Sequence, residues 1–185
     1  MGKYYTNSYG KIYSDLAYRL GVIAEQYDSL QIEDKYKYES TLYICVLQTL
    51  LTQFNEIKNE VEKRGADFNI EAIWNEDWSY WKIDTTTLSS SKDSPLNIKY
   101  VLENLRHILS HPNPIHNTCS YESNNENDKI IEYKFFRVNH GDAFSMEMPT
   151  SSLKSLVEKL SDYLSKVAGK SVEVQELKEK VKARL

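Results

Sequence analysis

The stretch from Asp34 to Lys63 constrains the fold most, because it contains neither proline nor glycine. With no helix breaker inside it and Gly65 following as a stop, it predicts one long helix. Its middle is apolar nearly all round, and such a helix belongs in the centre of a bundle rather than on its surface. The apolar positions are Leu42, Ile44, Val46, Leu47, Leu50, Leu51, Phe54, Ile57 and Val61.

Three further stretches carry apolar residues at intervals of three and four, which is the period of one helix face. They predict helices over residues 9–27, 95–110 and 151–169. The second of these has Ser94 as a cap and Pro95 at the first helical position, where proline is well tolerated. These helices and the central one supply the four apolar surfaces of a bundle.

One β-hairpin is expected before the last of these helices. Apolar and polar residues alternate over 131–135 and again over 144–148, and Asn139-His140-Gly141-Asp142 between them has turn chemistry. The polar, aperiodic residues 113–128 and the stretch that starts at Thr85 are interpreted as loops. A short helix should carry Trp74, Trp78 and Trp81 on one face.

Together these patterns predict a mainly α fold. We expect an up-and-down helical bundle with a four-helix core and a β-hairpin inserted before the last core helix. A chain of 185 residues is long enough to bury one core, so we expect a single domain over residues 1–185. Residues 172–185 mix acidic and basic side chains and should form a helical extension of that domain.

Composition narrows the setting in which the protein works. The formal net charge is −4, so no global positive field attracts polyanions and any nucleic-acid contact must be local. Two cysteines are too few for a disulfide framework. The first residues lack an apolar signal region, and no stretch reaches the ~18 apolar residues that span a bilayer. We therefore expect a cytoplasmic protein with no membrane partner.

The four histidines, His107, His111, His116 and His140, fall close together in the sequence, around the end of the third main helix and the hairpin. Imidazole exchanges protons near neutral pH, and a neighbouring arginine stays charged and can bind phosphate through two parallel hydrogen bonds. This combination is suited to cleavage of a phosphodiester.

Helix geometry adds a condition to this chemistry. Arg106 and His111 would lie roughly 140° apart on a continuous helix and could not bind one ligand closely. Pro112 disfavours helical geometry at His111 and therefore ends the helix there. We expect the freed imidazole to turn back toward the arginine.

The run Leu-Arg-His-Ile-Leu-Ser-His-Pro over residues 105–112 resembles the signature of the HEPN superfamily, the higher eukaryote and prokaryote nucleotide-binding domain. That signature is an arginine, a polar residue, a few more residues and a histidine at the end of a bundle helix. The run looks like the nuclease branch found on plasmids, in toxin–antitoxin systems and in phage defence. His107 stands where asparagine or aspartate is more usual.

The resemblance implies a homodimer whose two motifs face each other and cleave RNA without a metal or other cofactor. The ribose 2′-hydroxyl would attack the neighbouring phosphate. By this resemblance His111 transfers a proton at the attacking or leaving oxygen, and Arg106 stabilises the charged transition state. His107 would orient the phosphate or supply the complementary proton transfer. RNA is then the substrate, and an antitoxin or defence protein is a possible partner.

Other interpretations of the same residues stay open. Arg106 and His111 could simply be cationic residues at a helix C-terminus, where the dipole favours them. A zinc site could be formed by His107, His111, His116 and Cys119, although zinc ligands normally come in tighter pairs. The protein could also be a non-catalytic nucleotide-binding or protein-interaction bundle, which the net negative charge favours.

Two further features have ordinary explanations. The tryptophans at 74, 78 and 81 could stack on RNA bases, but such a stripe is more often core or dimer interface. The charged tail is by default a solvated helix, although it could bind a partner such as an antitoxin.

Overall fold

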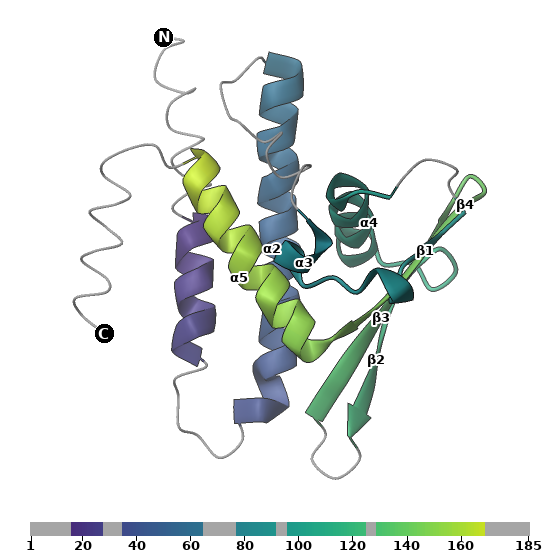
Figure 1. Cartoon of the computed structure of the whole chain (residues 1–185), viewed down its shortest axis with the longest axis horizontal. Helices are drawn as coiled ribbons and strands as arrows, with labels where there is room; N and C mark the ends of the chain where they lie inside the picture. The colour runs from purple at the N-terminus through teal and green to yellow at the C-terminus, as the bar shows by residue number, and fades with distance from the viewer. Residues whose placement is uncertain (1–15, 28–34, 65–76, 92–95, 125–128, 169–185) are drawn as a thin grey trace.

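The computed structural model describes residues 16–27, 35–64, 77–91, 96–124 and 129–168. In these ranges, packed helices cover a four-stranded antiparallel sheet (Figure 1). Three of the four strands lie between the third main helix and the last helix. The fold is therefore mixed α and β rather than mainly α.

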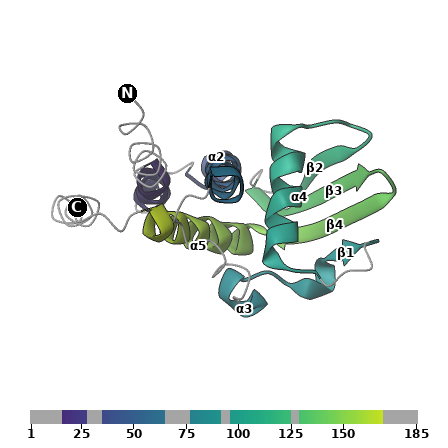
Figure 2. The same cartoon turned by 90° about the horizontal axis from the view of Figure 1, so that it is seen from above.

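The main helices lie close to where the apolar periods predict them. The first described helix covers residues 16–27, and residues 9–15 of its predicted range lie outside the described residues. α2 (Lys35–Arg64) is the long helix, and it packs against α5 (Thr150–Ala168), α4 (Ile98–Ser110) and the sheet. The predicted central position of this helix is confirmed (Figure 2).

The predicted hairpin is present, as the pair β3 (Lys129–Asn139) and β4 (Asp142–Pro149). His140 and Gly141 form its two-residue turn with φ of 49° and 86°. Positive φ at both positions is what a type I′ turn requires, and it matches the twist of the strands.

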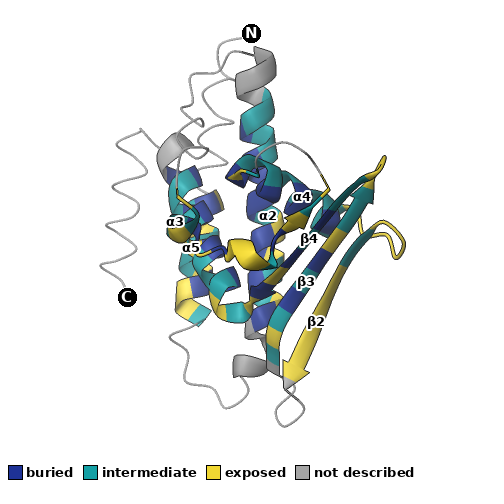
Figure 3. Ribbon diagram, turned by 45° about the vertical axis from the view of Figure 1, so that its right-hand side comes forward, coloured by how far each residue is buried: buried dark blue, intermediate teal, exposed yellow. Residues whose placement is uncertain are grey.

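The sheet is larger than the hairpin, because two segments interpreted as loops pair with it. β2 (Asn117–Asn124) pairs with β3, and β1 (Ser89–Ser90) pairs with β4, giving the order β1-β4-β3-β2. β2 is an edge strand that is exposed along much of its length (Figure 3). A strand with little burial on either side needs no apolar alternation, so its polar sequence had the composition of a loop.

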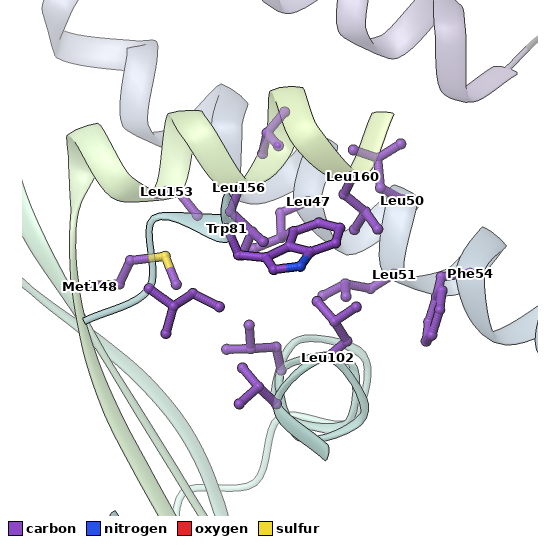
Figure 4. Close-up of a cluster of buried hydrophobic side chains, with 14 of the residues drawn as sticks. Leu47, Leu50, Leu51, Phe54, Trp81, Leu102, Met148, Leu153, Leu156 and Leu160 are labelled. Atoms are coloured by element: carbon purple, nitrogen blue, oxygen red, sulfur yellow. The ribbon is translucent and has the colours of Figure 1, made fainter. Parts of the chain in front are cut away.

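The core lies between the helices and one face of the sheet. α5 contributes Leu153, Leu156, Val157, Leu160 and Leu164, and β4 contributes Phe144, Met146 and Met148. Trp81, in the short helix α3 (Trp78–Trp81), is fully buried among leucines of α2 and α5 (Figure 4). None of the described helices lies on the other face of the sheet (Figures 1 and 2).

None of the described helices is both long enough and apolar enough to cross a bilayer.

Candidate active site

The site is built at the C-terminal end of α4. The helix begins at Ile98, because Asn97 has extended geometry and its side chain accepts a hydrogen bond from the amide of Tyr100 at 2.9 Å. The predicted cap Ser94 and the predicted first residue Pro95 lie outside the described residues. It ends after Ser110, as the proline at 112 predicts. Its buried side is held by Val101, Leu102, Leu105 and Ile108.

The helix end brings His107 and His111 together. His111 has left helical geometry, with φ −133° and ψ 60°, but its amide still donates to the carbonyl of His107 at 3.0 Å. The ring centroids are 5.9 Å apart, with 40° between the planes. His107 is partly buried and His111 is exposed. The result is a pair of imidazoles one helical turn apart.

Arg106 lies beside this pair but is not joined to it by a hydrogen bond within the described residues. Because α4 is continuous through Ser110, Arg106 stays roughly 140° round the helix from the direction of His111. Its guanidinium is partly buried, and Nε is buried without a hydrogen-bond partner in the described part of the chain. The helix end thus pairs His111 with His107 rather than with Arg106.

A second guanidinium, Arg137, reaches the same place from β3. Its Nη1 donates to Oδ1 of Asn104 at 2.7 Å. Asn104 is 2% exposed, and its own amide nitrogen donates to the carbonyl of Tyr100 at 2.8 Å. Sequence reasoning missed Arg137, although the alternation that predicts β3 puts it on the same face as Tyr133 and Phe135. A charged residue on the strand face that otherwise points into the core was the signal that could have identified Arg137.

The start of β2 fixes the backbone of the site. Asn117 pairs with Arg137 in the sheet register, and its side-chain nitrogen donates to the carbonyl of His111 at 2.9 Å. Two backbone hydrogen bonds of 2.9 Å close the link between Asn113 and Asn117. The segment after Pro112 is therefore a tight connection that ties the end of α4 to the sheet.

The surroundings of His107 lower its pKa below the usual value. Burial has the largest effect, followed by the positive charges of Arg137 and Arg106 and by His111, while Glu103 acts in the opposite direction. His107 is consequently neutral at pH 7 and able to accept a proton.

The acidic residue near the site is engaged elsewhere. Glu103 forms an ion pair with Lys58 of α2. No ion pair within the described residues joins a carboxylate to Arg106, His107, His111 or Arg137. The cluster is a local basic centre in a chain of net negative charge.

The alternative zinc set is not assembled. Among the described residues, no three histidine, cysteine, aspartate or glutamate side chains lie together as metal ligands. His116 and Cys119 are exposed, on the link and on β2. Although Cys119 is exposed as a whole, local burial raises the pKa of its thiol to about 11, so the thiolate that zinc prefers is disfavoured.

The aromatic and tail features are accounted for only in part. Trp81 is core and cannot stack on a base, and Trp78 is partly buried against the same core. Trp74 and the tail over residues 172–185 lie outside the described residues. His140 lies in the hairpin turn.

Comparison of the chain with models of known protein families, with curated proteins and with solved structures finds no match.

Proposed function

We propose that the protein is a metal-independent endoribonuclease that uses the histidine pair at the end of α4. The observation that carries the proposal is the placing of two imidazoles, with ring centroids 5.9 Å apart, beside two guanidiniums that have no carboxylate partner among the described residues. Two proton-transfer groups and a bound phosphate are what this cleavage needs.

The reaction divides between the two histidines. Neutral His107 accepts the proton of the ribose 2′-hydroxyl, and the oxygen forms a bond to the adjacent phosphorus. The bond from phosphorus to the 5′-oxygen breaks, and His111 donates a proton to that leaving oxygen. The products are a 2′,3′-cyclic phosphate and a free 5′-hydroxyl. Arg106 stabilises the extra negative charge of the transition state.

The assembly proposed with this activity is the one that the HEPN resemblance implies. The helices would form the up-and-down bundle of that superfamily, and two copies would pair with their α4 ends facing. Pairing would double the local positive charge and so offset the net −4 of each chain. The resemblance alone supports a role as a toxin or phage-defence effector.

Purified protein incubated with RNA in the presence of a chelator tests the activity, its metal independence and its site together. Replacing His111 or His107 with alanine should slow cleavage by about 10² to 10⁴, the usual contribution of a placed acid or base. His116→Ala is the matched control, since it removes an exposed imidazole only five residues after His111 in the sequence. Helicity measured by circular dichroism should not change.

Cleavage by H111A and H107A at the parent rate would refute the proposal. A second candidate, a non-catalytic binding module, is favoured by the negative net charge. It predicts that the parent binds nucleotide or RNA but leaves the RNA intact over the same period.

A further inference from the structure

Arg137 differs from an ordinary surface arginine in how it is held. One of its five N–H donors is bound by Asn104, whose amide is itself buried and anchored to the backbone of α4. The guanidinium is therefore fixed between helix and sheet instead of moving on a flexible stem. A group fixed in this way loses little entropy when it binds a ligand.

Within the part of the chain that the structure describes, the only side-chain hydrogen bond of Arg137 is to the neutral Asn104, and no carboxylate forms an ion pair with its guanidinium. A partly buried cation without a counter-ion is costly, and a bound anion removes that cost. The site thus favours an anion with several acceptor oxygens.

Arg137 lies near both imidazoles of the site, so an anion bound to it would lie near them too. Arg137 lies closely enough to His107 to lower its pKa, with a larger effect than Arg106 has. Asn117, its partner in the register, holds the carbonyl of His111. Arg137 therefore lies near His107, and through Asn117 it is linked to the backbone of His111, all within one chain.

We propose that Arg137 is the phosphate-binding residue of this site and that it holds a phosphate or phosphodiester against His107 and His111 of the same chain. This inference rests on the proposed function and deepens it, since it assigns to β3 a role that the α4 motif alone gives to Arg106. The planar guanidinium can donate two parallel hydrogen bonds to two phosphate oxygens.

Titration of the protein with inorganic phosphate, observed through the histidine resonances in NMR, tests the proposal without any turnover. Phosphate should shift the signals of His107 and His111 in the parent. In Arg137→Gln the apparent phosphate affinity should fall about tenfold or more, because hydrogen bonds between charged groups typically contribute a factor of this size. Arg106→Gln should have the smaller effect.

Lys134→Gln is the matched control. It removes a positive charge from the same strand, but Lys134 pairs with Glu122 and Glu147 on the face of the sheet that no helix covers. Phosphate affinity should not change. If R137Q loses its helical spectrum, Arg137→Lys replaces it, and we expect weaker binding because an ammonium lacks the two-pronged geometry.

Two results would overturn the inference: no phosphate-dependent shift in the parent, or unchanged affinity in the Arg137 variants. The assay also separates this inference from the proposed function. A parent that binds phosphate through Arg137 but leaves RNA intact would refute only the ribonuclease. A parent that cleaves RNA while the Arg137 variants bind phosphate normally would refute only the role of Arg137.

Discussion

At His107, burial and most of the neighbouring charges act on the pKa in the same direction. Burial, Arg137, Arg106 and His111 disfavour its protonation, while Glu103 favours it. NMR titration should therefore give a pKa for His107 below the ordinary value of about 6.5. Arg137→Gln should raise it, and Glu103→Gln should lower it further.

This shift also sets the sign of one pH effect on stability. Because the unfolded chain binds the proton more readily, His107 makes the free energy of unfolding decrease as the pH falls through about 6.5. The decrease ends below the folded pKa. The comparison of the parent with His107→Gln in urea at several pH values isolates this contribution. A His107 pKa at or above the ordinary value would contradict the account of the site.

At the residue scale, the sequence analysis paired His111 with Arg106, whereas the structure pairs it with His107. The spacing of four residues within one helical turn was a local signal for the observed pair. Arg137 reaches the site through strand pairing and through its hydrogen bond to Asn104, 33 positions away in the sequence, and a local pattern cannot predict a contact at that separation. The distance between Arg106 and His111 likewise depended on how the helix ends, which the proline fixes only in part.

Among the elements, the helix over residues 16–27 is held against α5 by an unusually close contact. The hydroxyl of Ser161 is buried and donates to the carbonyl of Ala17 at 2.6 Å. A Cβ at Gly21 would lie 2.3 Å from that oxygen and 3.2 Å from the Ser161 Cβ. A side chain at position 21 would therefore displace the Ser161 hydroxyl from its hydrogen bond to Ala17, which favours glycine there.

Gly21→Ala should therefore destabilise the protein, although alanine normally favours a helix. We expect the free energy of unfolding in urea to fall by about 1–3 kcal/mol, the usual cost of overpacking. The double variant Gly21→Ala with Ser161→Ala should recover part of that loss, while Ser161→Ala alone loses only a hydrogen bond of about 1 kcal/mol. A stabilised G21A would show that the two helices do not approach this closely.

The elements differ in how far the sequence predicts them. α2, α4, α5 and the β3–β4 hairpin have strong apolar periods or turn chemistry, and their positions were confirmed. β2 and β1 were missed, since the first is polar and the second is only two residues long. Both are stabilised by the neighbouring strands of the hairpin rather than by their own composition.

For the whole molecule, the proposed dimer and the proposed site make opposite predictions for mixed variants. We propose that His111 and Arg137 act in one chain, so co-refolded H111A and R137Q should show no more activity than the two variants apart. If Arg106 instead acts on the site of the other subunit, mixing variants should restore activity. Co-refolded R106A and H111A should then recover about a quarter of parental activity, because half of the dimers carry one intact site.

Formation of mixed dimers must be verified in this assay. A tag on one variant gives the mixed dimer a distinct mass, which shows that subunits have exchanged. Recovery in the H111A and R137Q mixture would show that β3 of one subunit serves α4 of the other. A monomer at micromolar concentration with full activity would remove the dimer from the mechanism.

The basic cluster in an acidic chain has a consequence for how ionic strength acts. At long range the net charge of −4 opposes the approach of a polyanion, while at contact the guanidiniums attract a phosphate. Dissolved salt screens the long-range repulsion strongly, because that repulsion acts over more than the Debye length of ~10 Å at 0.1 M. It screens the partly buried contact between guanidinium and phosphate much less. A modest increase in salt should therefore raise the rate of association with a polyanion before it lowers the affinity for its phosphate. For a uniformly basic nucleic-acid-binding protein, the same salt would lower the association rate.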